Sequence, residues 1–519
     1  MKLRLIAFAA AVLVGQTAFA APAVDVNDAA TVKVYMSGAS ALRGVLSSLV
    51  ATDICGGYAN NSSITVYNMS SSLALQSGKN DWAITCALPA AGAAKVGLAT
   101  GTKIAFFKTD AGGSAQGVFP VSSSLNLPFI DVTACTTVGT PDRVYSNCPV
   151  TASVKPHFGV SDLEPGMFRG VNSPNDQAGP NYGDAGLTAG EILALQITPV
   201  VQTVFAVAVN NNLYNDMFAF QGLNNKFAST GAACSLTSTD ENCIPSIGRA
   251  VARAFFAGSP VWTMLVGTGA GTKAATQMNI CRRVQGSGTQ AAANMAFADV
   301  GCSANSLSPT DVSGSDTASA EPMSAFTGKT LSGLTPLQYA ALNMGATLNA
   351  SGAPVYNGAM PAGGTFVFEG PGTGDVISCT TAAQQQGGYA IGHISKENAP
   401  KTDGSEFWKH VRLENVAPSR DNAKNGNYDY VVESTIQYKK ADFANFPASV
   451  KTFITKFIAE VKKPSALNNL SANAQNGVLA LPTSYTDLDP SVSADASVVK
   501  FGSRVSRGGL TCNPLQRVN

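Results

Sequence analysis

The chain has 519 residues, and 34 Lys and Arg against 33 Asp and Glu give it a formal net charge of +1. Apolar residues make up 45% and charged residues 13%, against a charged share of roughly 25% in typical soluble proteins. A chain of this length can bury a sizeable core, in two lobes or domains. The near-neutral charge gives no electrostatic basis for nucleic-acid binding. The three histidines are far apart in the sequence, which argues against a histidine-rich metal centre.

The first twenty residues have the pattern of a signal peptide. Met1–Arg4 is basic, Leu5–Val14 is an apolar run too short to span a bilayer, and Ala18–Ala20 is an A-x-A cleavage site. We therefore expect a mature chain that begins at Ala21 and is exported to the periplasm or the extracellular space. No Cys follows the site, so no lipid anchor is expected. No later stretch approaches roughly 20 uninterrupted apolar residues, so we do not expect an integral membrane protein.

The apolar pattern predicts an alternation of strands and helices along the mature chain. Helices are expected after the loop at 37–41, over 246–256, from the loop at 286–289 to 298, and over 450–461. Segments 301–335 and 464–500 are rich in Ser, Ala, Thr and Asn and are predicted to be loops. This alternation favours the α/β class with mainly parallel sheets. The predicted strands are 32–36, 64–67, 103–107, 203–209, 280–284, 365–368 and 389–394.

Ten cysteines fit an oxidising compartment. No C-x-x-C motif occurs, which argues against zinc binding and thioredoxin-like redox chemistry and favours structural disulfides. The sequence does not fix which cysteines pair. The short gaps favour pairing of neighbours, as Cys55–Cys86, Cys135–Cys148, Cys234–Cys243 and Cys281–Cys302, which leaves Cys379–Cys512.

Three strand-like runs lead into loops of Gly with Ser or Thr, at 37–41, 110–114 and 286–289. The first and third precede predicted helices, whose N-terminal N–H groups and partial positive charge bind anions without lysine. Gly lets the backbone approach an oxyanion closely, and hydroxyls add donors. Loops of this kind that converge predict an anion site. Taken singly, Ser40 and Ser287 are ordinary helix caps.

Two charged residues near these loops refine the expected ligand. Arg283 lies three residues before Gly286, and a guanidinium can contact two oxygens of phosphate at once. Ser161 and Asp162 end another strand-like run. An ionised carboxylate only accepts hydrogen bonds, so beside an anion it favours a ligand that carries a proton, such as phosphate, over sulfate. The alternative is that Asp162 is a cap or turn residue.

These segments resemble the phosphate-binding proteins of bacterial phosphate ABC transporters, within the type 2 periplasmic binding-protein superfamily. The loop 37–41 is similar to the family's opening Gly-Ala loop, 112–118 to its second Ser/Gly loop, and 158–162 to its strand-end Ser-Asp. Arg283–Thr289 resembles the family's Arg-x-x-Gly-Ser-Gly-Thr loop, the most specific of the matches. Residues 391–394 and 425–428 resemble its final segments. The matches are short and scattered over most of the mature chain.

The resemblance implies a two-lobed type 2 periplasmic binding-protein-like fold that closes on an anion, with lobes of 21–208 plus 426–519 and of 209–425. It implies a non-catalytic receptor for phosphate or a related oxyanion, with no cofactor and no metal, that works with an ABC permease. Arg283 would pair with two oxygens and Asp162 would accept the ligand's proton. The residues that the resemblance carries over to the cleft are Ser40, Ser114, Ser161, Asp162, Arg283, Ser287, Gly288 and Thr289.

The chain also departs from the family. Gln285 stands where the family often has an Asp that partners the loop Arg, Leu42–Gly44 replaces the usual Thr-Phe-Pro, and insertions are expected within 55–105 and 301–365. The identity of the ligand therefore stays open. One alternative is an extracellular structural or adhesive protein on the same scaffold, favoured by the low charge and the Ser-, Ala- and Asn-rich segments. Another is a secreted phosphatase, against which stand the missing G-x-S-x-G motif and metal-ligand spacing.

Overall fold

A computed structural model describes residues 22–69, 80–139, 143–174, 182–257, 261–304, 306–307, 334–370, 372–401, 403–482 and 490–518. The predicted signal peptide and most of the predicted loop at 301–335 lie outside these residues. The described strands form one large mixed sheet of 14 strands together with four two-stranded sheets. The main path of the large sheet runs β15-β12-β16-β10-β19-β9-β1-β4-β3-β2-β7-β6.

One end of this sheet, here called the β1 side, carries the N-terminal strands. At its centre β1 pairs in parallel with both β9 and β4, whereas β3 is antiparallel to its neighbours β4 and β2. The strands of the β1 side are β9 (Phe158–Ser161), β1 (Val32–Gly38), β4 (Lys103–Thr109), β3 (Asp81–Ala87), β2 (Thr65–Asn68), β7 (Val144–Ser146) and β6 (Thr137–Val138).

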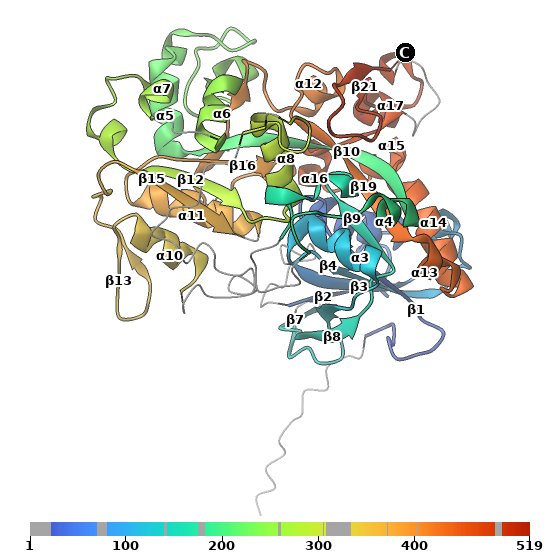
Figure 1. Ribbon diagram of the computed structural model, residues 1–519. Helices are drawn as coiled ribbons and strands as arrows, with labels where there is room; N and C mark the ends of the chain where they lie inside the picture. The colour runs from blue at the N-terminus through green and yellow to red at the C-terminus, as the bar shows by residue number, and fades with distance from the viewer. Residues whose placement is uncertain are drawn as a thin grey trace, which may run out of the picture.

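The opposite end, here called the β12 side, consists of β15 (Thr365–Gly370), β12 (Met278–Arg283) and β16 (Ala390–Ser395). β12 is parallel to both neighbours. Two long antiparallel strands, β10 (Leu195–Asn210) and β19 (Val431–Lys439), lie between the two sides, and β10 runs across the middle of the molecule in Figure 1. The short strands β17 (Trp408–His410) and β20 (Val478–Ala480) also pair with β10. The expected lobe boundary at 208–209 falls inside this crossing strand.

The remaining strands form small two-stranded sheets outside the main one. The pairs are β5 (Leu127–Ile130) with β8 (Val150–Val154), β11 (Ser246–Ile247) with β18 (Arg412–Leu413), β13 (Thr347–Leu348) with β14 (Pro354–Val355), and β21 (Val505–Ser506) with β22 (Gln516–Arg517).

Helices pack against the main sheet on both the β1 side and the β12 side (Figure 1). Those of the first half of the chain include α1 (Arg43–Ser48), which continues as the π-helix η1 (Leu49–Ile54), α2 (Ala90–Val96), the 3-10 helix η2 (Gly113–Gly117), α3 (Phe119–Ser123), η3 (Pro165–Met167), η4 (Gly170–Asn172), α4 (Ala189–Ala194), α5 (Asn211–Phe220) and α6 (Arg249–Ala257). Those of the second half include α7 (Thr263–Val266), α8 (Gly288–Ala298), α10 (Pro336–Asn343), α11 (Thr373–Gln385), α12 (Arg420–Lys424), α13 (Lys440–Ala444), α14 (Ala448–Val461), α15 (Pro464–Asn468), α16 (Ala472–Asn476) and α17 (Ala496–Phe501).

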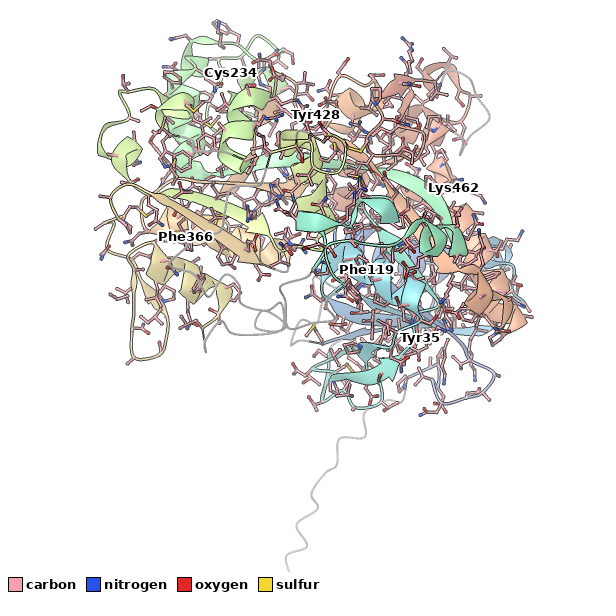
Figure 2. The ribbon with its side chains drawn as sticks, viewed as in Figure 1. Tyr35, Phe119, Cys234, Phe366, Tyr428 and Lys462 are labelled. Atoms are coloured by element: carbon pink, nitrogen blue, oxygen red, sulfur yellow. A yellow bond between two sulfur atoms is a disulfide. The ribbon has the colours of Figure 1, made fainter. Side chains whose placement is uncertain are left out.

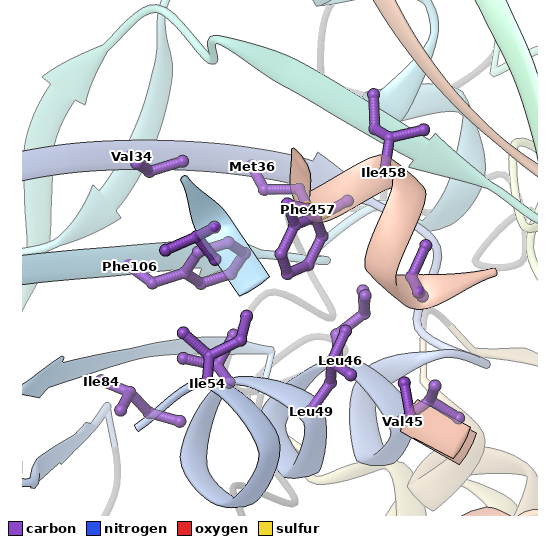
Figure 3. Packing of buried hydrophobic residues seen from close by; sticks show 14 of the residues in the cluster. Val34, Met36, Val45, Leu46, Leu49, Ile54, Ile84, Phe106, Phe457 and Ile458 are labelled. Atoms are coloured by element: carbon purple, nitrogen blue, oxygen red, sulfur yellow. The ribbon is translucent and has the colours of Figure 1, made fainter. Parts of the chain in front are cut away.

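Alternating strand residues divide the core of the β1 side between two faces. Ile104 and Phe106 of β4 pack into a cluster with helices, whereas Ala105 and Phe107 face the small β5–β8 sheet. Figure 3 shows the helical face, where Phe457 of α14 lies against Phe106 and above the α1–η1 segment. The predicted apolar stripe at 450–461 is thus the buried face of α14.

The β12 side is likewise covered on both faces. Ile280 packs with α6 and α8, while the next residue, Cys281, points toward α10 and α11 together with Phe366 and Phe368. Figure 2 shows Phe366 on this side and Tyr35 far away on the β1 side. Because both faces of the central strands are buried, the apolar residues of β10 run continuously from Val204 to Val209, as expected for such a strand. The α/β class with parallel pairing at the centre of each side is confirmed.

Two predictions of local structure are wrong. Segment 464–500 is not a loop throughout, because α15, α16, β20 and α17 lie in it and bury Leu467, Ala474 and Leu479. The helix predicted from Ser246 starts only at Arg249, since Ser246 and Ile247 pair as β11 with β18. In both places tertiary packing outweighs the local signal.

The ten cysteines form five disulfides. Three predicted pairs are confirmed, Cys55–Cys86, Cys135–Cys148 and Cys234–Cys243. The predicted pairs Cys281–Cys302 and Cys379–Cys512 are wrong. Cys281 pairs with Cys379 because α11 packs directly on β12, and Cys302 pairs with Cys512 because the C-terminal segment lies over the end of α8.

Candidate functional site

The sheet topology places four strand ends near one another. β9, β1 and β4 are parallel neighbours, so the segments that follow them emerge at the same edge of the sheet. Ser161 and Asp162 end β9, Ser40 follows β1, and Ser114 follows β4 in η2. The loop after β12 approaches this edge from the β12 side, where the Ala115 N–H donates to the Gly286 carbonyl oxygen at 2.9 Å.

Arg283 crosses from the β12 side to the opening loop of the β1 side. Its Nη1 donates to Ser40 Oγ at 3.1 Å, and its Nε donates to the Gly370 carbonyl oxygen at 3.2 Å. The side chain is buried, with 1% of the residue exposed. Ser40 is not the cap of α1, because Leu42 occupies the N-cap position, so the hydroxyl is available to the guanidinium.

Asp162 and Ser114 form the acceptor part of the site. Ser114 Oγ accepts from the Asp162 backbone N–H at 3.0 Å and donates to Asp162 Oδ2 at 3.2 Å. Within the described part of the chain, neither Asp162 Oδ1 nor Ser161 Oγ has a hydrogen-bond partner, although both atoms are buried. Buried polar atoms nearly always have partners, and these two unpartnered acceptor-capable atoms lie next to each other at the end of β9.

The first turn of α8 lies directly against Ser114 and Asp162. Ser287 is the N-cap, and its hydroxyl accepts from the Gln290 N–H at 3.4 Å, as a cap residue should. A Cβ atom added to Gly288 would lie 2.2 Å from Ser114 Oγ and 2.4 Å from Asp162 Oδ2. The absence of a side chain at this position therefore lets the helix terminus approach the carboxyl group. Backbone N–H groups in the first turn, including those of Gly288 and Thr289, lack acceptors within the helix.

Burial controls the charge state of the two principal ionisable groups. Desolvation raises the pKa of Asp162 to about 6, although the Ser114 hydrogen bond and the positive charges of Arg283 and Lys108 oppose the shift. Desolvation lowers the pKa of Arg283 to about 10, opposed most strongly by the negative charge of Asp375. Arg283 therefore stays charged at neutral pH, and Asp162 can gain or lose a proton near the pH at which phosphate does.

Asp375 supplies the negative charge that partners Arg283. The resembled family often has an Asp for this at the position where this chain has Gln285. Asp375 lies in the first turn of α11, where its Oδ2 accepts from the Gly372 N–H at 2.7 Å, close to the carbonyl that holds Arg283. Its carboxylate is the strongest charge that stabilises the guanidinium. The two residues are 92 positions apart, so local sequence patterns could not connect them.

A second group of charged residues near the site was also missed. Lys108 is fully buried, and its Nζ donates to the Gly38 and Thr109 carbonyl oxygens, the latter at 3.1 Å; burial lowers its pKa to about 8. Arg43 makes a two-pronged ion pair with Asp110, with Nε–Oδ2 2.8 Å and Nη2–Oδ1 2.7 Å. A Lys that follows the apolar residues Ile104–Phe107 and precedes a Gly-rich loop was the sequence signal available for Lys108.

A buried polar chain positions Arg283 from behind. Gln290 Oε1 accepts from the Arg283 backbone N–H at 3.2 Å and contacts His393 Nε2 at 3.0 Å, while its Nε2 donates to Asn294 Oδ1 at 2.8 Å. Asn294 in turn donates to Asn172 Oδ1 at 2.9 Å. Burial lowers the pKa of His393 to about 3, so this histidine is neutral and supports the loop as a hydrogen-bond donor.

The structure brings the eight predicted site residues to the junction of the two sides, and all eight are buried: Ser40, Ser114, Ser161, Asp162, Arg283, Ser287, Gly288 and Thr289. Direct contacts link Ser40 to Arg283 and join Ser114, Asp162 and Gly288. Thr289 is buried one residue further along α8. The other two histidines have partners outside this group, Tyr35 for His157 and Lys396 for His410.

Within the described residues, no group of three or more His, Cys, Asp and Glu side chains is arranged to hold a metal ion. In the same part of the chain, no helix combines the length and the apolar character needed to cross a bilayer.

No protein-family model and no curated protein matches the chain. Among solved structures, a phosphate ABC transporter substrate-binding protein from Clostridium perfringens, determined with bound phosphate, is 12% identical, with 85% of this chain and 98% of that chain covered and a TM-score of 0.39. An ABC-type phosphate transport receptor from Vibrio cholerae is 10% identical over 84% of this chain and 96% of its own, with a TM-score of 0.34. PstS from Borrelia burgdorferi is also 10% identical, with coverages of 84% and 95% and a TM-score of 0.31. At this level of similarity, only the residues of this chain bear on its ligand.

Proposed function

We propose that this chain is an exported, non-catalytic solute-binding protein that captures phosphate, or a related oxyanion carrying a proton, between the β1 and β12 sides. The observation that carries this proposal is the buried Asp162 carboxyl group, which has one oxygen without a partner and lies against both Ser114 and the first turn of α8. An ionised carboxyl group at an anion site is favourable only if the ligand supplies a proton.

The surrounding groups supply the donors that such a ligand requires. Arg283 would turn its guanidinium from Ser40 to two ligand oxygens, a charge-assisted contact that is stronger than a neutral hydrogen bond. Backbone N–H groups of Gly288 and Thr289 would add the partial positive charge of the α8 terminus, an 11-residue helix. The hydroxyls of Ser40, Ser114, Ser161 and Ser287 would complete the shell.

The setting suits a protein of the periplasm or the extracellular space. Five disulfides are typical of an oxidising compartment. In this proposal the lobes 21–208 with 426–519 and 209–425 close on the ligand, and an ABC permease receives it. Release to a permease requires the two sides to separate, because every proposed ligand contact is buried in the structure described above.

Isothermal titration calorimetry with phosphate and with sulfate tests the proposal, on the wild type and on Asp162→Asn. The wild type should bind phosphate 1:1 and prefer it to sulfate. An amide at position 162 donates where the carboxylate accepts, so phosphate affinity should fall by about 10- to 100-fold, the worth of one charge-assisted hydrogen bond, while sulfate affinity should rise.

Asp403→Asn is the matched control, because that carboxylate is exposed and accepts from the N–H and hydroxyl of Ser405 in its own turn. It should leave both affinities unchanged. Absence of heat with phosphate and sulfate in the wild type would refute the proposal. Equal affinity for the two anions would refute the role assigned to Asp162.

A further inference from the structure

Two adjacent residues of the C-terminal segment contact both sides of the site. The Thr511 N–H donates to Glu164 Oε1 at 2.9 Å, and the Thr511 hydroxyl donates to Oε2 of the same carboxylate. Glu164 follows Asp162 by two residues. The next residue of the tail, Cys512, is disulfide-bonded to Cys302, four residues beyond the end of α8. The segments that carry Asp162 and Ser287–Thr289 are therefore tied to the same point.

The preceding tail residues are fixed to the crossing strands. Glu433 of β19 accepts from the Ser506 hydroxyl at 2.8 Å, from the Arg507 N–H at 2.7 Å and from the Gly509 N–H at 2.5 Å. Gln202 of β10 donates to the Val505 carbonyl oxygen at 2.7 Å. Residues 505–512, here called the C-terminal strap, thus run from the crossing strands to the point where the two sides of the site meet.

The disulfide at the end of the strap differs from the others in its accessibility. Cys302 and Cys512 are both exposed, whereas the other eight cysteines are buried or half-buried. A cleft of about 690 Å³ opens beside Cys302, lined also by Arg169, Asp184 and Gly301. Thiol–disulfide exchange requires a thiolate to reach one sulfur of the bond, so exposure decides which disulfide reacts first under native conditions.

We propose that Cys302–Cys512 is a redox-cleavable bond that holds the two sides of the site together, and that its reduction by a dithiol lets them separate. The thiolate of the dithiol attacks one sulfur, the Sγ–Sγ bond breaks, and the other cysteine leaves as a thiolate that takes up a proton. The second thiol of the reagent then displaces the first cysteine. The dithiol ends as a disulfide, and Cys302 and Cys512 end as two thiols.

Reduction of the disulfide removes the covalent link between the end of α8 and the strap. With the disulfide intact, the end of α8 is linked through Cys512 to Thr511, so it moves away from Glu164 only if the Thr511 hydrogen bonds break. With the bond cleaved, the strap no longer links α8 to Glu164, and separation is opposed by the contacts inside the site and by the hydrogen bonds from Arg169 to Gly301 and from Asn294 to Asn172. The Ala115 N–H, which donates across the junction to Gly286, then exchanges with solvent whenever the sides part. The inference needs no ligand and so can fail independently of the proposed function.

The first experiment is limited reduction of the native protein with dithiothreitol, followed by alkylation and peptide mass spectrometry. Cys302 and Cys512 should be alkylated before any other cysteine. Cys234–Cys243 is the internal control, because it closes a short segment and both of its residues are buried. Alkylation of that pair first, or of all five pairs together, would overturn the proposal.

The second experiment measures amide hydrogen exchange in the ligand-free double variant Cys302→Ser with Cys512→Ser. The Ala115 amide should exchange at least about tenfold faster than in the wild type, since a link across 210 residues is lost. Two amides bonded within one side should not change, Leu88, which donates to the Thr102 carbonyl oxygen, and Gly388, which donates to that of Ala383.

The control double variant, Cys234→Ser with Cys243→Ser, should leave Ala115 exchange as in the wild type. If the double variant Cys302→Ser with Cys512→Ser loses its native circular dichroism, the variant Glu164→Gln tests the proposal instead. It keeps the disulfide and weakens the hydrogen bonds between Glu164 and Thr511. It should also speed Ala115 exchange, by a smaller factor. Unchanged Ala115 exchange in whichever variant folds would overturn the proposal.

Discussion

Replacement of Asp162 by Asn should stabilise the ligand-free protein at alkaline pH and leave its stability unchanged at acid pH. Burial raises the pKa of this carboxyl group from 3.8 to about 6. A group whose pKa is raised by folding adds stability below its unfolded pKa and loses it as the pH rises through the folded value. Ionised Asp162 therefore opposes folding above pH 6, and the uncharged amide does not.

The size of the effect follows from the shift in pKa. About two units, at 1.36 kcal/mol for each unit, give about 3 kcal/mol between pH 4 and pH 8. The geometry favours a clean comparison, because an Asn side chain has the same shape and its carbonyl oxygen can still accept from the Ser114 hydroxyl. The gain at pH 8 should therefore approach this value.

Urea unfolding in oxyanion-free buffers at pH 4, 6 and 8 provides the measurement, with Asp403→Asn as the exposed control. The difference in unfolding free energy between Asp162→Asn and the wild type should grow from near zero at pH 4 to about 3 kcal/mol at pH 8. A difference that is the same at all three pH values, or that decreases with pH, would refute a raised pKa for Asp162. It would also refute the charge state assigned to Asp162 in the site.

Three further outcomes are expected. Gly288→Ala places a methyl group against the Ser114 hydroxyl and the Asp162 carboxyl group, so phosphate affinity in calorimetry should fall at least about tenfold. Gly374→Ala, in the first turn of α11, should bind like the wild type, because its added Cβ meets no other residue within 4 Å. Arg283→Lys loses the planar guanidinium and should weaken phosphate binding by about 10- to 100-fold. Arg282→Lys, at a residue that forms an ion pair with Glu369, should not weaken it, and equal losses would contradict the role assigned to Arg283. Phe457→Ala empties a fully buried position in the core of the β1 side and should lower the free energy of unfolding by about 3–5 kcal/mol in urea titrations, a value below 1 kcal/mol being incompatible with the packing described.

The part of the site that the sequence predicts is the part encoded in short segments. Arg283 and Ser287–Thr289 lie within seven residues, and Ser161 with Asp162 directly ends a strand, so residue type and spacing identify them. Asp375 and Lys108 could not be found in this way. Asp375 reaches the guanidinium only because α11 packs beside β12, and Lys108 is buried only because the loop after β1 folds over it.

The fold shows the same division between local and distant signals. The strong apolar run at 203–209 predicts the interior of β10, and the stripe at 450–461 predicts α14, because burial on one or both faces leaves a periodic trace. The pairing of Cys281 with Cys379 leaves no such trace, since it depends on which helix covers which strand. Short helices such as α15 and α16 are stabilised by contacts with the core rather than by their own sequences.

β10 has a consequence for how the molecule can be dissected. This single strand of 16 residues pairs with β19 and β20 between Leu195 and Val204 and with β16 and β17 between Phe205 and Asn210. A fragment of the chain that contains only the β1 side or only the β12 side must either end within β10 or leave hydrogen-bonding groups along the edge of β10 unpaired. Separate expression of the portions should therefore give insoluble material, and soluble protein should return only when complementary fragments are produced together.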